Sequence, residues 1–576
     1  MKTTVGALLV PGLLVLFPHA HAPLDSSEVT LSSPSSVALA SQDAPGHLRT
    51  ASTSAAPEAP PAPSEVLNEV RTSDELLRRR IEGIVPSHRF PRSDWALLAV
   101  SLEHGDTLFA RNADLPLAPA SNAKVLTSAA ALHYLGADFR FPTFVLADGP
   151  VVDGTLQGDL ILYGTGDPAL SDRFHSSRTV ALEGLAQQLR ALGVVQVQGD
   201  IVGDGTFFAV AGAPESWDPR NFTNAYSAPA SALSFNENVV TLRVGPGPVE
   251  GAAARIRTIP EGVEVNLHNE GRTVSGRAWP PIVVDRDRFE EPIRVTGNTR
   301  LGGPEAWRVI PVGDPAAYTA SAFRSVLGEE GIRVEGRARA VNPPETSRVG
   351  SAPLVAPRLQ GGPEPPRVLA IHHSPPLLEL LEVVNKHSNN LYSELILLTL
   401  GRLVLGEGSF QGGTGSVLRF MERTVGLDVT SIELYDGSGL SRENRVRARD
   451  LVAVLAYMEA SPQAEEYWST FPEAGNPQGL RRMYRSAAAG NLLAKTGTIR
   501  QVSALSGVVR TAEGEPVLFS IMGNRVPSTA AFKGVEDRIG IELAGFRRSV
   551  APPSPGPSIP GTATEGVAEE GEGVEP

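Results

Sequence analysis

Ser121 and Lys124 stand three residues apart at the start of an apolar segment. Between residues 125 and 135 apolar side chains recur at helical spacing, and Gly136 follows as a helix stop. This spacing places the Ser121 hydroxyl and the Lys124 amine on one face of a helix. Since burial disfavours the ammonium form, a buried Lys124 can accept the Ser121 proton and create a nucleophile. The alternative is that Ser121 only caps the helix.

A second group, Lys495, Thr496 and Gly497, precedes a strand-like segment at residues 502–510. On a strand that borders a cleft, Lys495 would offer a cation and Thr496 a hydroxyl to a substrate carboxylate. Gly497 would let the backbone come close to a bound peptide. An ordinary exposed turn could use the same residues, so this group alone does not establish a site.

A polar triplet that begins at Ser388 interrupts the helical run at residues 377–404. One interpretation is structural, because a polar triplet between two apolar segments is typical of a helix cap and a kink. The functional interpretation is that Ser388 relays a proton between a lysine and a leaving amine. Asn390 would then donate a hydrogen bond to the substrate amide.

Lysine is rare in this chain, which carries most of its positive charge on arginine. The five lysines are Lys2, Lys124, Lys386, Lys495 and Lys533. Because a guanidinium does not lose its proton in a protein, lysine at 124 and 495 indicates that a compact or titratable amine is required there.

In chain order, the motifs S-x-x-K, S-x-N and K-T-G are the signature of penicillin-binding proteins and serine β-lactamases. Ser121 and Ser388 are 267 positions apart (388 − 121), a longer spacing than in an ordinary β-lactamase. In this the sequence resembles the class C low-molecular-mass penicillin-binding proteins, the D-alanyl-D-alanine carboxypeptidase/endopeptidases of peptidase family S13. Segments resembling further landmarks of that family lie at residues 164–168, 199–204, 226–229, 236–238, 385–386 and 436–441. The second motif departs from the family by reading Ser-Asn-Asn where Ser-Asp-Asn is commoner.

The resemblance implies an α+β fold of the serine β-lactamase/DD-peptidase type. A five-stranded antiparallel sheet flanked by helices would be split by inserted β-rich domains. The implied activity is that of a serine-type D-Ala-D-Ala carboxypeptidase, which trims peptidoglycan stem peptides or cross-links through an acyl-enzyme. β-Lactams would acylate the same serine as covalent inhibitors, and neither a metal nor an organic cofactor is expected.

The resemblance also assigns roles to individual residues. The expected catalytic residues are Ser121, Lys124, Ser388, Asn390 and Lys495. The expected substrate-binding residues are Thr496, Gly497, Thr498, Leu440 and Tyr226. Ser121 would attack the carbonyl of the penultimate D-Ala with Lys124 as base, and the backbone N–H groups of Ser121 and Thr498 would hold the oxyanion. Lys495, Thr496 and Thr498 would bind the terminal carboxylate.

At 576 residues the chain is longer than one hydrophobic core usually organises. We expect a signal peptide at 1–22, a disordered Ser/Ala/Pro linker at 23–66, a split catalytic domain at 67–140 and 368–548, inserted β-rich domains at 141–367 and a disordered acidic tail at 549–576. Lys2 followed by an apolar run indicates export, to the periplasm or another extracytoplasmic location. If the apolar run is retained, peripheral membrane association is an open alternative.

Composition excludes several other classes of function. The net charge of −13 argues against a nucleic-acid partner, and the absence of cysteine excludes thiolate catalysis. A metallopeptidase has no support, because His372 and His373 lack an H-E-x-x-H context. Two alternatives stay open: a β-lactamase or esterase with the same nucleophile, and a non-catalytic, β-lactam-sensing wall-binding protein of the same fold.

Overall fold

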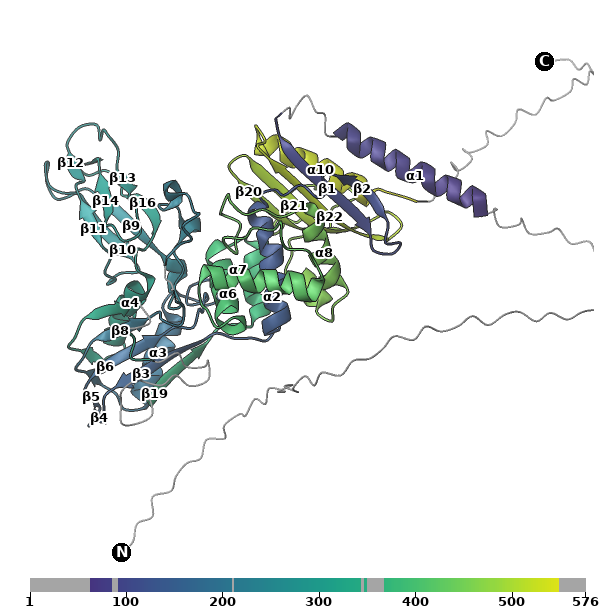
Figure 1. Ribbon diagram of the computed structural model, residues 1–576. Helices are drawn as coiled ribbons and strands as arrows, with labels where there is room; N and C mark the ends of the chain where they lie inside the picture. Colours follow the sequence, from purple (N-terminus) through teal and green to yellow (C-terminus); the bar gives the residue numbers. More distant parts are fainter. Residues whose placement is uncertain (1–62, 85–91, 210–211, 343–345, 350–366, 549–576) are drawn as a thin grey trace, which may run out of the picture. The chain divides into compact units, whose positions relative to one another are not determined.

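The computed structural model describes residues 63–84, 92–209, 212–342, 346–349 and 367–548 (Figure 1). The predicted signal peptide, the acidic tail and residues 23–62 of the predicted linker lie outside these ranges. The last four residues of the predicted linker are helical instead, because helix α1 spans Pro63–Ile84. Proline suits this place, since the first turn of a helix does not use its N–H groups.

A five-stranded antiparallel sheet joins both ends of the described chain (Figure 1). Its strands in spatial order are β2 (Thr107–Arg111), β1 (Asp94–Ser101), β22 (Pro516–Asn524), β21 (Val502–Arg510) and β20 (Leu492–Ile499). Successive side chains of a strand point to opposite faces, so Leu97 and Leu98 of β1 enter two separate hydrophobic cores. Helices cover both faces, which confirms the predicted α+β class and five-stranded antiparallel sheet.

One face of this sheet packs against α1 and α10 (Thr529–Ala544). The other face packs against α2 (Ala123–Leu135) and α8 (Ala448–Glu459). Around α2 lie the remaining helices of this layer: α5 (Leu377–Lys386), α6 (Asn390–Val404), α7 (Phe410–Phe420), the π-turn η6 (Met421–Val425) and α9 (Ala464–Ser469). α2 is buried along almost its whole length, which holds its first turn rigidly against the sheet.

A second five-stranded sheet, of mixed direction, forms the centre of the inserted segment. Its strands in spatial order are β18 (Ala338–Val341), β8 (Ile201–Asp204), β6 (Asp159–Tyr163), β3 (Pro142–Asp148) and β19 (Arg367–His373). Helices α3 (Val180–Ala191) and α4 (Pro315–Glu329) share a hydrophobic core with it. Because β19 pairs with β3, residues 368–373 belong to this inserted sheet, although the sequence analysis placed them in the catalytic part.

Smaller sheets complete the inserted segment. One contains β10 (Arg255–Ile259), β9 (Val239–Gly245) and β16 (Ala306–Pro311); a second contains β11 (Leu267–Asn269), β14 (Ile293–Thr296) and β13 (Val283–Asp285). A third pairs β12 (Arg272–Val274) with β15 (Asn298–Arg300), and a fourth contains β17 (Arg333–Val334), β7 (Gln196–Val197), β5 (Thr155–Leu156) and β4 (Val151–Val152). Short 3-10 turns lie at η2 (Pro219–Asn221), η3 (Ala225–Ser227) and η4 (Asn236–Asn238).

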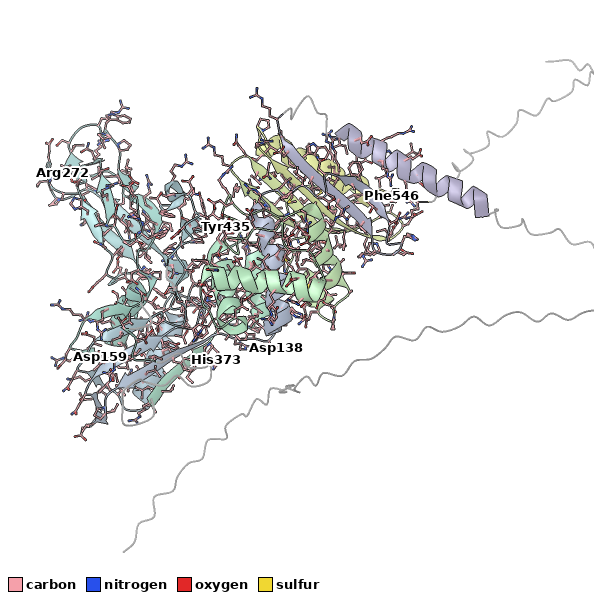
Figure 2. The ribbon with its side chains drawn as sticks, in the orientation of Figure 1. Asp138, Asp159, Arg272, His373, Tyr435 and Phe546 are labelled. Carbon is pink, nitrogen blue, oxygen red and sulfur yellow. The ribbon has the colours of Figure 1, made fainter. Side chains whose placement is uncertain are left out.

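The chain enters and leaves the inserted segment at neighbouring points. Pro142 at the start of β3 pairs with His373 at the end of β19, and Figure 2 labels His373 and Asp138 there. α6 then connects the two parts of the fold, because Leu391, Leu395 and Leu398 pack against the inserted sheet. The same helix begins at Asn390, so one element is both part of this interface and part of the candidate site.

Among the described residues, no helix combines the length and the apolar character needed to cross a membrane.

Candidate active site

Ser121 lies in a 3-10 turn, η1 (Ala120–Asn122), that leads directly into α2. The N-cap position of α2 is Asn122, so Ser121 does not serve as the helix cap that the structural alternative required. Instead, the Lys124 Nζ atom lies 3.2 Å from the Ser121 Oγ atom. The three-residue spacing predicted that these two groups lie within reach of each other, and Lys124 is also completely buried.

Lys124 has two further partners, the Asn390 Oδ1 atom at 2.8 Å and the Ser438 carbonyl oxygen at 2.7 Å. A neutral lysine amine has two N–H groups and one lone pair. When both N–H groups are donated to Asn390 and Ser438, the lone pair is directed at the Ser121 hydroxyl. The geometry therefore suits an amine that accepts the Ser121 proton.

Burial lowers the pKa of Lys124 to about 8, although the nearby carboxylates of Glu394 and Asp436 act to raise it. The pKa of Glu394, in contrast, is raised. Burial, with a smaller effect from Asp436, raises the pKa of Glu394 to about 8. The charge on each of these two groups therefore influences the pKa of the other.

Glu394 is a site residue that the sequence analysis missed. It lies in α6, four residues after Asn390, and is fully buried. Its carboxylate accepts hydrogen bonds from the N–H groups of Gly437 at 2.9 Å and Ser438 at 2.8 Å. The only hint in the sequence was an acidic residue within a mostly apolar helical run, 391–401; the structure shows that all eleven of these residues are buried, where a carboxylate needs a specific partner.

A turn at residues 436–441 presses against the nucleophile. The Asp436 carboxylate holds this turn by accepting hydrogen bonds from the N–H groups of Gly439 and Ser441 and from the side chains of Asn444 and Trp217. Gly439 has φ +79°, and a Cβ atom there would lie 1.8 Å from the Ala120 carbonyl oxygen. Only glycine therefore fits at this contact.

The second motif connects three elements. Ser388 lies between α5 and α6 with φ +56°, a backbone conformation that non-glycine residues rarely adopt. Asn389 caps α6 through the Tyr392 N–H group, so the cap and kink of the structural alternative are present beside the functional residues. The Asn390 Nδ2 atom donates to the Tyr226 carbonyl oxygen at 2.8 Å, which joins the inserted segment to the site.

Lys495 is also completely buried, on the edge strand β20. Its Nζ atom donates to the Ser388 Oγ atom and to the Thr496 carbonyl oxygen, both at 2.9 Å. Burial, with a smaller effect from Lys124, lowers the pKa of Lys495 well below its usual value. The K-T-G motif is therefore joined directly to the S-x-N motif by a hydrogen bond from Lys495 to Ser388.

The structure gives a reason for glycine at position 497 that differs from the predicted one. A Cβ atom at this position would lie 2.8 Å from the Pro119 carbonyl oxygen and 3.0 Å from the Ser121 backbone nitrogen. The glycine thus lets β20 approach the turn that carries the nucleophile. The prediction had explained it by the approach of a bound peptide.

A cleft of about 720 Å³ opens beside Ser121. Its lining residues are Ser121, Asp218, Arg220, Asn221, Tyr226, Ser388, Asn390, Leu440, Arg442 and 498–501. Six of the ten predicted site residues therefore line it: Ser121, Tyr226, Ser388, Asn390, Leu440 and Thr498. The other four, Lys124, Lys495, Thr496 and Gly497, do not line the cleft but belong to its supporting wall. Arginines 220, 442 and 500 add positive charge that the sequence analysis did not predict.

Within the described ranges, no cluster of three or more His, Asp or Glu side chains could hold a metal ion.

Comparisons with known proteins agree on one family. The model of the D-Ala-D-Ala carboxypeptidase 3 (S13) family matches residues 77–543. A D-alanyl-D-alanine carboxypeptidase from Actinomadura sp. (strain R39) is 32% identical, over 83% of this chain and 86% of the relative. The D-alanyl-D-alanine carboxypeptidase DacB of Haemophilus influenzae is 25% identical, over 74% of this chain and 84% of the relative.

The fold has solved counterparts. A crystal structure of penicillin binding protein 4 (dacB) from Haemophilus influenzae matches with a TM-score of 0.66 and 24% identity, over 81% of this chain and 99% of that one. A second structure of that protein, complexed with a novel β-lactam, matches with a TM-score of 0.60 and 23% identity, over 80% and 98% of the two chains.

Proposed function

The chain belongs to the D-Ala-D-Ala carboxypeptidase 3 (S13) family, and from this premise we propose that Ser121 is the residue that becomes acylated. The protein is a serine-type D-Ala-D-Ala carboxypeptidase of the class C penicillin-binding type. The observation that carries the assignment of the nucleophile is the 3.2 Å contact between the Ser121 hydroxyl and the buried Lys124 amine.

Acylation begins when the neutral Lys124 amine takes the proton of Ser121, whose Oγ atom then attacks the carbonyl of the penultimate D-Ala. The negative charge on the tetrahedral oxygen is stabilised by the N–H groups of Ser121 and Thr498. Two features of Thr498 support this role. It lies on an edge strand, where alternate N–H groups have no strand partner, and it lines the cleft.

As the C–N bond to the terminal D-alanine breaks, the proton that Lys124 took from Ser121 passes to the leaving amine through Ser388, which lies in the cleft and accepts a hydrogen bond from Lys495. Asn390 holds Lys124 and binds the substrate amide. Because Lys495 is buried and does not line the cleft, its amine supports the binding site of the terminal carboxylate from behind, through its hydrogen bonds to Ser388 and Thr496. Thr498, which is exposed, contacts that carboxylate directly. Water then hydrolyses the acyl-enzyme and regenerates Ser121.

β-Lactams are proposed to acylate Ser121 as well, since a structural relative of the same fold was solved with a β-lactam. Peptidoglycan stem peptides and cross-links ending in D-Ala-D-Ala are the proposed natural substrates. These substrates lie outside the cytoplasm, so we place the enzyme in the periplasm or another extracytoplasmic location. The segment that would address or attach it to a membrane lies outside the described residues.

The test is covalent labelling with a fluorescent penicillin, followed by mass spectrometry of the labelled peptide and of a muropeptide ending in D-Ala-D-Ala. Wild-type protein should carry the label on Ser121 and release D-alanine. Ser121→Ala should do neither while keeping its melting temperature, and Ser177→Ala, at an exposed serine, should behave as wild type.

Three results would contradict this assignment in different ways. A label on another residue would remove Ser121 as the nucleophile. Rapid turnover of nitrocefin without muropeptide cleavage would favour the β-lactamase alternative. Labelling without release of D-alanine would favour the β-lactam-sensing alternative.

A further inference from the structure

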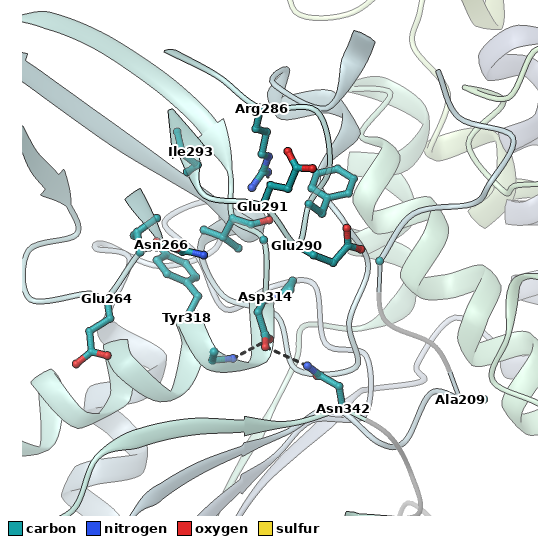
Figure 3. Close-up of a pocket in the computed structure, with 17 residues that line it drawn as sticks. Ala209, Glu264, Asn266, Arg286, Glu290, Glu291, Ile293, Asp314, Tyr318 and Asn342 are labelled. Carbon is teal, nitrogen blue, oxygen red and sulfur yellow. Dashed lines mark hydrogen bonds between the residues drawn. The ribbon is translucent and has the colours of Figure 1, made fainter. Parts of the chain in front are cut away.

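A second cavity, of about 680 Å³, lies within the inserted segment and shares no lining residue with the active-site cleft (Figure 3). Its walls come from the segment between β13 and β14, the segment between β16 and α4, and the first turns of α4. Asn342, which follows β18, closes one side. The cavity is of the size that binds small organic ligands.

Arg286 projects into this cavity although its side chain is 97% buried (3% exposed). One terminal nitrogen donates to the carbonyl oxygens of Pro311 and Val312, and the guanidinium lies 4.7 Å from the centre of the Phe289 ring. In the part of the chain that the structure describes, the Nε atom has no hydrogen-bond partner and no carboxylate lies within ion-pair distance of the guanidinium. Burial lowers the pKa of Arg286 to about 10, although the nearby Glu290 carboxylate acts to raise it, so the protein offsets only part of the cost of burying this charge.

Asn342 lines the same cavity and is held in place by Asp314. Its Nδ2 atom donates to the Asp314 Oδ2 atom at 3.1 Å, and Asp314 in turn caps α4 by accepting the Ala317 N–H group at 3.0 Å. The Asn342 Oδ1 atom is buried and has no partner among the described residues. Because this oxygen has almost no accessible surface, Asn342 contributes to the wall of the cavity through its other atoms.

The remaining charges of the wall are negative. Glu264, Glu290 and Glu291 line the cavity, and Figure 3 shows Glu290 and Glu291 on the same side as Arg286 and Glu264 apart from them. A simple anion would be attracted by Arg286 but repelled by the glutamates. A simple cation would be attracted by the glutamates but repelled by Arg286. A ligand that carries both an ammonium and a carboxylate matches both parts of the wall.

We propose that this cavity is a second, non-catalytic binding site for an α-amino-acid head group, with the carboxylate on Arg286 and the ammonium on the glutamates of the wall. Two sources share this chemistry: free D-alanine, and a short peptide with a free amino end and a free carboxyl end. The proposal goes beyond the proposed function, which enters only in the choice of probes.

The experiment measures equilibrium binding by titration calorimetry to the full-length Ser121→Ala variant, which prevents turnover. The probes are D-alanine and D-Ala-D-Ala, with N-acetyl-D-Ala-D-Ala as the analogue without an ammonium and D-alaninamide as the analogue without a carboxylate. We expect saturable binding of at least one zwitterionic probe and at least tenfold weaker binding of both analogues. Binding of D-alanine would identify the free amino acid as a ligand, and binding of D-Ala-D-Ala alone would identify the peptide.

Variants assign the binding to this cavity. Adding Arg286→Met should weaken it at least tenfold, and Glu264→Gln, at an exposed position where folding is not at risk, should also weaken it. Arg288→Met is the matched control, because it removes an exposed arginine two positions away and should change nothing. In the background that keeps Ser121, Arg286→Met should leave kcat/KM on a muropeptide unchanged.

Each opposite result would overturn the proposal. These are the absence of saturable binding by either zwitterion, equal binding of the N-acetyl analogue, or binding that survives both Arg286→Met and Glu264→Gln. A fall in kcat/KM for a folded Arg286→Met variant would show that the cavity serves the catalytic site. Failure of Ser121 labelling in the earlier test would leave these outcomes unaffected.

Discussion

Lys124 and Glu394 make the acyl-transfer centre sensitive to pH through two buried residues. Lys124 acts as a base only when neutral, and its pKa is about 8. Below this value the amine is protonated and inactive, so kcat/KM should rise as the pH approaches 8 and level off above it. The Glu394 carboxylate raises the pKa of Lys124, which places the rise at higher pH than burial alone would.

Glu394→Gln should therefore move the midpoint of this rise to lower pH, because the negative charge that favours the ammonium form is removed. The measurement is a pH profile of kcat/KM on either side of pH 8. Glutamine keeps one acceptor oxygen for the two N–H groups, so we also expect a loss of about 1–3 kcal/mol of stability. Glu382→Gln, at a half-exposed carboxylate on α5, is the control and should leave both quantities unchanged.

A profile that falls equally at every pH, with an unchanged midpoint, would mean that Glu394 only supports the turn at residues 437–438. Rescue by Glu394→Asp would separate the effect of charge from that of shape. A midpoint that moves to higher pH would contradict the assigned sign.

At this scale the sequence could predict the residues that carry motifs but not those that support them. Ser121 and Lys124 are recognisable because their spacing alone brings their side chains together. The role of Glu394 can be recognised only when α6 and the turn at residues 436–441 are known to be adjacent in the fold. Those segments are about 40 positions apart in the sequence. Gly497 was predicted to let the backbone approach a bound peptide, which stays a prediction; its close approach to Pro119 and Ser121 depends on the tertiary fold and could not be read from the sequence.

Among the structural elements, the turn at residues 436–441 is the one that most directly constrains the nucleophile. Gly439→Ala would place a methyl group against the Ala120 carbonyl oxygen and force a left-handed backbone on alanine. We expect the rate of acylation by penicillin to fall at least tenfold and the stability to fall by more than about 1 kcal/mol. Stopped-flow labelling and thermal unfolding measure the two effects.

Gly534→Ala is the matched control for this change. Gly534 lies on the exposed face of α10, and no atom lies within 4 Å of the position that its Cβ atom would occupy. Alanine there should raise stability by up to about 1 kcal/mol and leave labelling unchanged. Wild-type labelling by Gly439→Ala would show that the turn does not restrain Ser121.

Individual elements were well predicted wherever local pattern determines them. α2 covers the apolar helical periodicity expected at residues 125–135, and β21 covers the strand-like segment at residues 502–510. The assignment of residues 368–373 failed for a physical reason: an apolar strand pattern does not specify which sheet the strand will join. The domain boundaries at residues 140 and 548 stay predictions.

Across the whole molecule, Arg548 ties the last described residues to the first. Its guanidinium forms ion pairs with Asp74 of α1, with Asp106 before β2 and with Glu515 before β22. The Ser73 hydroxyl also donates a hydrogen bond to the Arg548 carbonyl oxygen. The Arg548 side chain is only 12% exposed, so its removal would leave these carboxylates facing one another without a counterion.

Arg548→Met should therefore lower the stability by about 2 kcal/mol or more, measured as a fall in melting temperature. Arg547→Met, at the exposed neighbouring position, should have little effect, and so should removal of residues 551–576. Equal melting temperatures for Arg548→Met and Arg547→Met would show that the ion pairs contribute nothing and that α1 is held by its apolar contacts alone.

The pairing of β1 with β22 has a consequence for the order in which the protein can assemble. Trp95 lies opposite Gly523, so a ribosome that adds about 5–20 residues per second needs roughly 20–90 seconds to supply the partner of β1. The core of the inserted segment, in contrast, uses only residues between 145 and 370 and can close while synthesis continues. Interior contacts between such distant positions are slow to form. A chain released before β20 would thus carry a packed insertion and the Ser121–Lys124 pair, yet lack the edge strand that completes the acyl-transfer centre.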